Sequence, residues 1–336
     1  MGRCMRILIT GGYGNISWWV TKQALELGHE VHILNREQTT STRREIPSEV
    51  KVINIDYRDF KAVEESLENL SFDVVCDFLC FSKENAESAY QLFKHKTKQY
   101  ILISTESVFK RYDIVSEKSI KYTEEEASPY ILGKLQAENY LTEKMKNENF
   151  PLTVVRPGYT LDTILPYSIG HNCYTVANRY LNGKPILIAG SGENKWTFTH
   201  SSDFASAFSA VMGNPDTVGD DFNIIGDTVS TFNNIMGIFA KELVNKEPEF
   251  IHIPYKICLS LPIMPEDLMK QRMENALFDN SKIKSLAPDW KTKMGAKDIV
   301  TSTLKWLNED ERRKRINKEL DEKLEKLTIT YKDYND

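Results

Sequence analysis

Short apolar runs alternate with longer stretches of helical periodicity through the first half of the chain. The apolar runs predict strands at residues 7–10, 29–34, 50–55, 72–79, 100–104 and 152–155. The stretches between them predict helices at residues 16–27, 60–70, 84–94 and 130–146. The run at 72–79 is almost continuously apolar, as is typical of a parallel strand covered on both faces. This alternation predicts an α/β fold with a doubly wound parallel sheet, whose ligand lies at the carboxyl ends of the strands.

The regular alternation ends near Gly158. Beyond it, loops rich in glycine, proline and asparagine separate shorter elements, which predicts a smaller lid that contacts the substrate and returns some segments to the large sheet. The tail at residues 309–327 is highly charged but carries four apolar residues at helical spacing: Ile316, Leu320, Leu324 and Leu327. This pattern predicts one docked amphipathic helix, because a coiled coil needs a longer repeat.

Composition narrows the function classes. The chain has 336 residues, of which 41% are hydrophobic and 27% charged, as is ordinary for a globular protein. Its formal net charge of -5 argues against a general nucleic-acid binder. No apolar run approaches the roughly 18 residues that span a bilayer, and the start lacks the apolar segment of a signal peptide. We therefore expect a cytoplasmic protein with neither a membrane nor a nucleic acid as its partner.

Five cysteines and six histidines are scattered along the sequence. Cys76 and Cys80 lie in the apolar context of the fourth predicted strand, where a buried free thiol is the expected state. The histidines are not at metal-ligand spacing from one another, so the sequence predicts no metal site.

The first strand runs directly into a glycine-rich turn. Gly11, Gly12 and Gly14 follow the strand, and Ser17 stands at the third glycine position of the spacing. Glycines permit the tight turn and let a pyrophosphate approach the backbone, while the following helix supplies free N–H groups and a partial positive charge. The turn predicts a dinucleotide-binding Rossmann domain in residues 1–157, with the mainly substrate-binding part in residues 158–336.

The end of the second strand bears on the choice of cofactor. A fold that binds NAD usually has Asp or Glu here to accept from the adenosine ribose hydroxyls. This chain has Asn35 and Arg36, with Arg43 and Arg44 shortly after. Because an arginine pairs with a 2′-phosphate through charge-assisted hydrogen bonds, NADP is favoured over NAD; a solvated surface arginine is the alternative. Asp56, after the third strand, either contacts the adenine edge or caps the next helix.

Tyr130 and Lys134 are four residues apart on the long predicted helix, so they share a face. A phenol titrates at about 10, too high for a base at neutral pH, but a neighbouring ammonium and a positive nicotinamide lower its pKa. We therefore predict that Lys134 makes Tyr130 a usable acid/base. Ser104, Thr105 and Ser107 follow the fifth strand. We expect Thr105 to hydrogen-bond the reacting oxygen, with Ser104 or Ser107 as substitutes.

Several motifs together resemble the short-chain dehydrogenases/reductases, and most closely their extended branch of nucleotide-sugar epimerases and dehydratases. They cover nearly the whole chain: residues 10–16 (TGGYGNI), 104–106 (STE), Tyr130 with Lys134, 156–157 (RP) and 198–203 (FTHSSD). The resemblance implies that Thr105, Tyr130 and Lys134 form the catalytic trio. With the residues above, it places the cofactor against Gly11, Gly12, Gly14, Asn15, Ile16, Arg36, Asp56, Tyr57, Phe78, Ser104 and Lys134.

The sequence also departs from that branch. Glu106 falls where the dehydratases have the acid that protonates the departing hydroxyl, but Ser107 replaces the glutamate that follows it in them. Trp196 stands where the nucleotide-sugar enzymes have an arginine for the substrate diphosphate. This suggests a substrate without a diphosphate, or one held by a neighbour such as Lys195. The departures resemble atypical bacterial members, some of them similar to chloroplast stem-loop RNA-binding proteins.

Three residues are expected on the substrate side: Tyr159, Trp196 and His200. His200 also precedes an N-cap signal, so a structural histidine bonded to backbone is the alternative. The resemblance implies hydride transfer at a hydroxyl or carbonyl carbon of a sugar-like substrate. Two alternatives stay open: an NADPH-dependent reductase of a non-sugar carbonyl, and a cofactor-binding scaffold associated with nucleic acid. A homodimer also stays open.

Overall fold

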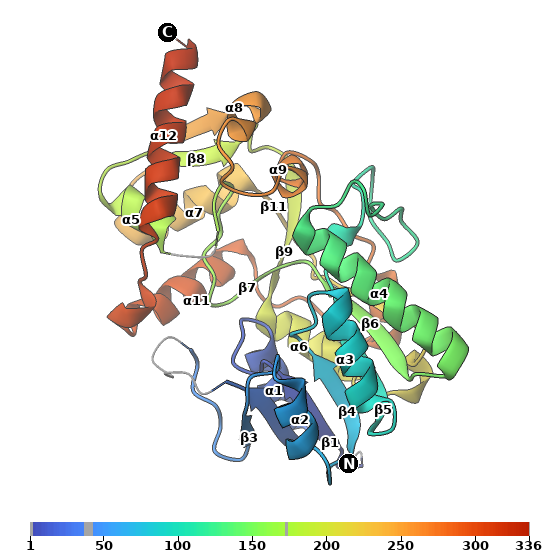
Figure 1. Cartoon of the computed structure of the whole chain (residues 1–336). Coiled ribbons are helices and arrows are strands. Elements are labelled where there is room, and N and C mark those ends of the chain that lie inside the picture. The colour runs from blue at the N-terminus through green and yellow to red at the C-terminus, as the bar shows by residue number, and fades with distance from the viewer. Residues whose placement is uncertain (1–2, 37–42, 172–173, 336) are drawn as a thin grey trace.

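The computed structural model describes residues 3–36, 43–171 and 174–335 (Figure 1). Within these ranges a seven-stranded parallel sheet forms the centre of the fold, in the order β10-β6-β5-β4-β1-β2-β3. Its strands are β1 (Arg6–Thr10), β2 (Glu30–Asn35), β3 (Lys51–Asn54), β4 (Phe72–Asp77), β5 (Thr97–Ile103), β6 (Leu152–Pro157) and β10 (Asp221–Ile224). The predicted doubly wound α/β sheet is confirmed, with strand ends that differ by a few residues.

The strand order reverses between β1 and β4. From β1 the chain moves outward through β2 to β3, and β4 then pairs with the other edge of β1. Thr10 and Asp77, the last residues of β1 and β4, are partners in register. The connections leave this point in opposite directions, so a crevice opens at the carboxyl ends of the strands.

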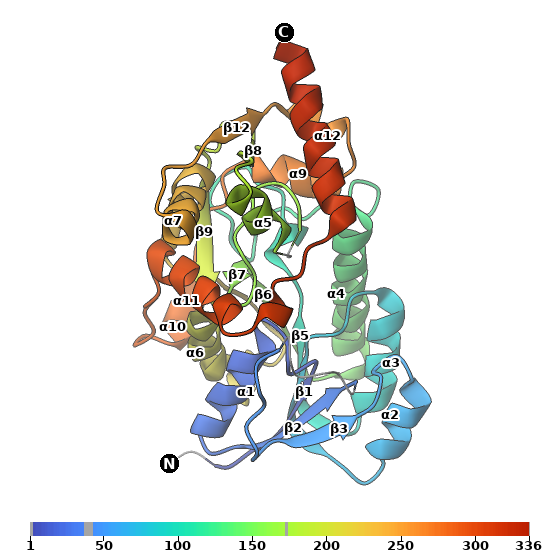
Figure 2. The same cartoon turned by 90° about the vertical axis from the view of Figure 1, so that its left-hand side faces the viewer.

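Alternate residues of each strand enter different cores. Ile7 and Ile9 of β1 pack with α1, α6 and α10, whereas Leu8 packs with α2, α3 and α4. This follows from the period of two along a strand. The two helical layers lie on opposite sides of the sheet in Figure 2. The helices are α1 (Ser17–Glu26), α2 (Phe60–Ser66), α3 (Lys83–Phe93), α4 (Pro129–Glu148), α6 (Ser201–Val211) and α10 (Ser281–Leu286).

The remaining elements stand over the carboxyl ends of the sheet (Figure 1). These elements share a hydrophobic core of their own, whose buried residues include Trp196, Phe198, Phe232 and Trp306. The strands are β7 (Tyr159–Leu161), β8 (Ile186–Ala189), β9 (Lys195–His200), β11 (Thr228–Thr231) and β12 (Phe250–Ile253). The helices are α5 (Thr175–Leu181), α7 (Phe232–Val244), α8 (Tyr255–Leu259), α9 (Glu266–Arg272) and α11 (Ala296–Asn308). The division of the chain at residue 157 stays a prediction.

The C-terminal helix differs from the expectation at its start. The sequence predicts one helix over residues 309–327, but α12 spans Lys318–Asn335 and a short 3-10 turn, η4 (Glu311–Arg313), precedes it. The side chain of Asn317 accepts the amide N–H of Leu320 at 2.9 Å, so Asn317 acts as the helix cap. Ile316 therefore lies before the helix and is exposed, whereas Leu320, Leu324 and Leu327 are buried.

A buried ion-pair network joins α4, β6 and β10. Arg156 is 1% exposed, and its Nε and Nη2 each donate to a carboxylate oxygen of Glu138 at 2.8 Å. Its Nη1 donates to Asp221 at 2.6 Å, and Lys121 donates to Glu138 at 2.7 Å. Burial raises the pKa of Glu138, but the charges of Arg156 and Lys121 outweigh this effect and lower the pKa to about 2. The network ties β6 to its neighbour β10 in the sheet and to the covering helix α4.

Candidate active site

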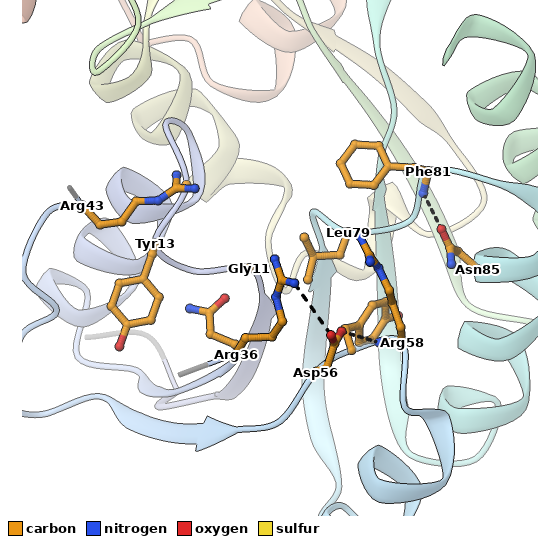
Figure 3. A pocket seen from close by; sticks show the side chains of 12 residues that line it. Gly11, Tyr13, Arg36, Arg43, Asp56, Arg58, Leu79, Phe81 and Asn85 are labelled. Carbon is orange, nitrogen blue, oxygen red and sulfur yellow. Dashed lines mark hydrogen bonds and ion pairs between the residues drawn. The ribbon is translucent and has the colours of Figure 1, made fainter. Parts of the chain in front are cut away.

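A pocket of about 340 Å³ opens at the carboxyl ends of β1, β2 and β4 (Figure 3). Its lining consists of Gly11, Tyr13, Gly14, Asn35, Arg36, Arg43, Asp56, Tyr57, Arg58, Leu79, Phe81 and Asn85. The structure thus brings five of the predicted cofactor residues together: Gly11, Gly14, Arg36, Asp56 and Tyr57. The crevice that the strand order creates is where this pocket lies.

The glycine turn is built so that no side chain fits its first two positions. Gly11 has φ of +71°, a conformation that favours glycine. A Cβ on Gly11 would lie 2.9 Å from Leu79, and one on Gly12 would lie 2.6 Å from Ile33. The backbone of the turn is therefore bare toward the pocket. A diphosphate can approach it closely.

The amide N–H groups of Asn15 and Ile16 donate to no protein acceptor among the described residues. They lie just before α1, where unpaired amides and the helix dipole attract an anion. The side chain of Asn15 points elsewhere: it donates to the Thr160 carbonyl at 2.9 Å and accepts from the Thr163 amide at 2.9 Å. Only the backbone of Asn15 is thus available to a cofactor. The residues of the turn fit a dinucleotide diphosphate.

The adenosine end of the pocket carries an unpaired buried donor. Asn35 is 8% exposed and its Nδ2 has no hydrogen-bond partner among the described residues. Arg36 is half-exposed and lies 3.8 Å from Asp56 (Figure 3). The alternative that Asp56 caps α2 is wrong, because Asp59 is the cap and accepts the amide of Ala62 at 3.1 Å. Asn35 and Arg36 together offer donors to a ribose oxygen or a phosphate.

A buried carboxylate beneath the pocket was not anticipated as a site residue. Asp77 is fully buried and accepts hydrogen bonds from Thr10 at 2.7 Å, Tyr57 at 2.5 Å and Tyr100 at 2.6 Å. Burial and the charge of Asp77 raise the pKa values of both phenols. The network ties the ends of β1 and β4 to the middle of β5. An aspartate inside an otherwise apolar run was the signal for it.

Phe78 is not part of the pocket lining. Its amide donates to the Thr10 hydroxyl at 3.0 Å, and its side chain packs against the sheet core. The backbone direction instead brings Leu79 and Phe81 to the pocket. The prediction that Phe78 contacts the cofactor therefore has no support in its side-chain position.

The hydroxyl residues after β5 lie beside the start of α4. Ser104 is 3% exposed, and its Oγ has no partner among the described residues. Thr105 caps the short turn η2 (Glu106–Val108), accepting the amide of Ser107 at 3.2 Å. Tyr130 lies in the first turn of α4, and its phenol faces Thr105 and Glu106. Thr105 and Tyr130 are therefore neighbours, as a shared reacting oxygen requires.

Lys134 is held beneath this group. It is 2% exposed, and its Nζ donates to the carbonyl oxygens of Cys80 at 2.7 Å and Ile103 at 2.8 Å. The Nζ also lies 4.2 Å from the ring centroid of Phe81. Burial lowers the pKa of Lys134 to about 8. An ammonium has three donors, so the described residues leave one of them for a ligand.

Lys134 does not by itself lower the pKa of Tyr130, contrary to its expected part in the effect, whereas the part assigned to the nicotinamide stays a prediction. Tyr130 is 41% exposed, but partial desolvation raises the pKa of its phenol. A hydrogen bond with Thr105 opposes this effect, and the charge of Glu106 adds to it. The Lys134 ammonium is engaged by two backbone carbonyls rather than by the phenol. A base at Tyr130 therefore needs a positive charge that the protein side chains do not supply.

Glu106 is paired with a cation rather than poised as an acid. It is 5% exposed, and Arg111 Nη2 lies 2.6 Å from its Oε2. Arg111 Nη2 also lies 3.3 Å from Gln271 Oε1, and Gln271 donates to the Ser107 carbonyl at 3.1 Å. A carboxylate bound to a guanidinium acts as an acceptor, which opposes the proton-donor role predicted for Glu106. No local sequence signal pointed to Arg111 or Gln271.

The residues expected on the substrate side meet a further arginine. The guanidinium carbon of Arg272 lies 4.4 Å from the ring centroid of Tyr159 and 4.7 Å from that of Trp196. The Nε of Arg272 is buried without a partner in the described part of the chain. Trp196 is 3% exposed and donates to the Glu274 carbonyl at 3.0 Å. Arg272 thus places a positive charge beside Trp196.

His200 lies apart from this cluster. It is 2% exposed and caps α6, its Nδ1 accepting the amide of Ser202 at 3.2 Å. Its Nε2 lies 3.5 Å from an oxygen of Asp162. Both ring nitrogens are occupied by the protein. This geometry corresponds to the structural alternative rather than to a substrate contact.

The family model for the NAD dependent epimerase/dehydratase family matches residues 7–224. The chain belongs to this family. The match covers the sheet, the glycine turn and the Thr105, Tyr130 and Lys134 group. It also confirms the resemblance drawn from the sequence motifs.

One sequence relative and two proteins of the same fold are similar to this chain over most of its length. Chloroplast stem-loop binding protein of 41 kDa b from Arabidopsis thaliana is 29% identical over 261 residues, covering 74% of this chain and 65% of that protein. Pal from Bacillus thuringiensis has a TM-score of 0.74 at 23% identity, covering 91% of this chain and 99% of Pal. UDP-glucuronic acid 4-epimerase from Bacillus cereus, solved with NAD, has a TM-score of 0.68 at 19% identity and the same coverage.

The described part of the chain contains no helix that is both long and apolar enough to cross a membrane. The cytoplasmic location and the homodimer stay predictions.

Gly133, which precedes Lys134, is packed so closely that it cannot carry a side chain without displacing its neighbours. A Cβ at Gly133 would lie 2.2 Å from the carbonyl oxygen of Phe81, so Gly133→Ala must push the loop after β4 away from α4. We expect a loss of about 1–3 kcal/mol in unfolding free energy by urea titration, as is typical of overpacking. Gly237→Ala in α7 is the control, because nothing lies within 4 Å of its Cβ. Equal stability of Gly133→Ala and the native protein contradicts this constraint.

Proposed function

We propose that this chain is an NAD(P)-dependent enzyme that transfers a hydride at a hydroxyl-bearing or carbonyl carbon of a sugar-like, nucleotide-linked substrate. The observation that carries the proposal is the meeting of Thr105, Tyr130 and Lys134 beside the pocket of the glycine turn. A protein that only binds a cofactor and catalyses no reaction does not need all three of these residues. The family membership supports the same reaction class.

The position of each residue assigns it either to cofactor binding or to proton transfer. The bare glycine turn and the free amides of Asn15 and Ile16 bind the cofactor diphosphate, and Lys134 offers its remaining N–H to the ribose. When bound, the nicotinamide cofactor accepts and returns the hydride and brings positive charge to the site. Tyr130 removes the proton from the substrate hydroxyl and returns it, while Thr105 donates a hydrogen bond to the same oxygen.

The positive charge of Arg272 on the substrate side supports a substrate that carries a diphosphate. Trp196 replaces the arginine expected there, but Arg272 lies against its ring with a buried, unpaired Nε. A guanidinium held in this way pairs with a phosphate through charge-assisted hydrogen bonds. The B. cereus relative was solved with UDP-glucuronic acid and NAD. Arg272, rather than Lys195, is therefore the proposed anion ligand.

The experiment is a screen of UDP-, GDP- and dTDP-linked sugars with the full chain and saturating cofactor. Thermal shift reports binding, and transient change of nicotinamide absorbance together with product analysis reports chemistry. We expect one nucleotide sugar to stabilise the protein and to be converted. Arg272→Gln is expected to lose the stabilisation. Conversion of none of these sugars, or stabilisation that survives Arg272→Gln, counts against the proposal.

We further propose that the enzyme prefers NADP(H) to NAD(H). Arg36 lies at the end of β2 beside the unpaired donor of Asn35, where a 2′-phosphate would accept from both. Calorimetry is expected to show an affinity for NADP about 10–100-fold higher than for NAD. Arg36→Ala is expected to erase the difference, whereas Lys61→Ala, on the exposed surface of α2, is not. Equal affinities of the native protein for the two cofactors contradict the preference.

A second candidate function is a cofactor-binding scaffold associated with nucleic acid. The observation in its favour is the 29% identity to the chloroplast stem-loop binding protein. The net charge of -5 argues against it. Salt-sensitive retention of a stem-loop RNA, without conversion of any sugar in the screen above, would favour the scaffold over the enzyme.

A further inference from the structure

A second cavity, of about 400 Å³, adjoins the cofactor pocket. Its lining includes Asn15 of the glycine turn, Arg43 of the segment between β2 and β3, Trp306 of α11, and Arg313 and Arg315 of the segment between α11 and α12. Arg43 also lines the cofactor pocket, so the two cavities share a wall. None of the catalytic residues lines this second cavity.

The cavity is basic and lacks counter-charges on two of its three arginines. Arg43 and Arg315 form no ion pair with a carboxylate among the described residues, whereas their neighbours do. Arg44 lies 2.6 Å from Asp162, and Arg312 lies 2.7 Å from Asp310. Two of the three arginines that line the cavity, Arg43 and Arg315, are thus left without an acidic partner among the described residues.

The two unpaired arginines come close enough to affect each other. Arg43 and Arg315 are both exposed to solvent, yet partial desolvation and the charge of Arg315 both lower the pKa of Arg43. Two guanidinium groups that approach from segments 272 residues apart in the numbering repel one another. An anion between them removes this repulsion.

The third arginine is already held in place. Arg313 Nη1 donates to the Trp306 carbonyl at 2.6 Å and to Glu309 at 2.9 Å. Its Nε is buried and has no partner in the described part of the chain. The contacts immobilise the guanidinium and leave a donor unused, which is the arrangement expected of a preformed anion site.

We propose that Arg43, Arg313 and Arg315 form a phosphate-binding pocket that joins the glycine-turn side of the molecule to the segment before α12. Three arginines match a ligand with more than one negative charge, and guanidinium groups bind phosphate oxygens through paired hydrogen bonds. The phosphate belongs either to the diphosphate of the dinucleotide or to a separate phosphorylated molecule. This inference goes beyond the proposed reaction and does not depend on it.

The test uses the full chain and inorganic pyrophosphate in isothermal titration calorimetry. Arg315→Gln and Arg43→Gln are each expected to weaken pyrophosphate binding about tenfold or more. Arg312→Gln is the matched control, since Arg312 is an exposed arginine of the same segment that is paired with Asp310 and absent from the lining. The control is expected to bind as the native protein does. No pyrophosphate binding by the native protein, or equal losses in Arg315→Gln and Arg312→Gln, overturns the proposal.

A second arm identifies the source of the phosphate. Pyrophosphate is titrated again in the presence of saturating ADP-ribose. If ADP-ribose blocks pyrophosphate and is itself weakened by Arg315→Gln, the pocket holds the diphosphate of the dinucleotide. If pyrophosphate still binds and remains sensitive to Arg315→Gln, the pocket takes a separate phosphorylated ligand. Neither readout needs turnover, so failure of the proposed reaction leaves this test unaffected.

Discussion

Tyr130→Phe is expected to lower the single-turnover rate by about 10²–10⁴-fold, the usual cost of losing a positioned general acid/base. The substitution removes only the hydroxyl that faces Thr105 and Glu106. Cofactor affinity should therefore stay at the native value. The measurement is the rate of nicotinamide absorbance change at saturating cofactor, with the nucleotide sugar that the screen identifies.

Two companion variants separate catalysis from packing. Lys134→Ala is expected to weaken cofactor binding as well as the rate, because Lys134 holds both the loop carbonyl of Cys80 and, by proposal, the ribose. Thr105→Ala is expected to give an intermediate loss, since Ser104 or water can replace one hydrogen bond. Similar small losses, below about tenfold, at all three positions would mean that Tyr130 and Lys134 only pack.

The pH dependence of cofactor binding follows from the position of Lys134. Burial lowers its pKa to about 8, so the ammonium is present below that pH and is lost as the pH rises through it. Affinity for the cofactor is therefore expected to fall as the pH rises above about 8. The fall should be absent in Lys134→Ala. The same calorimetric titration, repeated across this pH range, measures both.

Arg156→Leu is expected to cost about 3–5 kcal/mol of unfolding free energy, the usual effect of breaking a buried ion pair. It leaves the carboxylate of Glu138 buried with Lys121 as its remaining cation. Urea titration measures the loss. The double variant Arg156→Leu with Glu138→Leu should be more stable than Arg156→Leu alone, because no buried carboxylate remains and Lys121 is partly exposed to solvent. Lys144→Ala, which removes an i,i+4 surface pair, is the control and should change stability by at most about 0.5 kcal/mol.

The same network predicts how acid affects the native protein. The pKa of Glu138 in the folded chain is lowered to about 2, below its ordinary value of about 4.3. The stabilisation it provides is therefore complete above the ordinary value and is lost as the pH falls from there to about 2. The loss of unfolding free energy on acidification should be smaller in the double variant Arg156→Leu with Glu138→Leu than in the native protein. A loss of less than 1 kcal/mol in Arg156→Leu would mean that the network is not stabilising.

Much of the fold could be predicted because its signals are local. The apolar runs at residues 7–10 and 72–79 match β1 and β4 closely, since a strand buried on both faces needs only its own sequence to be recognised. Gly11 and Gly14 were identified by spacing, and the pocket forms where they lie. The start of α12 was misplaced because the helical spacing of Ile316 outweighed the local cap signal of Asn317.

In the candidate site, local sequence signals predicted the residues but not their contacts. Tyr130 and Lys134 were found because both lie on one helix at a fixed spacing. The partners of Lys134 are backbone carbonyls of Cys80 and Ile103, which no side-chain motif marks. Leu79 and Phe81 line the pocket in place of Phe78 because of the path that the chain takes after β4. The same path places the Cys80 carbonyl against the Lys134 ammonium, so the ammonium does not act on the Tyr130 phenol as expected.

The sequence by itself determined the order of strands and helices, the glycine turn and the residue types of the catalytic group, because each follows from periodicity or spacing within a few turns of chain. The tertiary structure alone decided which charges meet. Glu106 pairs with Arg111, which Gln271 also contacts, and Arg43 lies near Arg315. Charges act through space and not along the chain, so the pairing of residues from distant segments exists only once the sheet and the elements above it have packed.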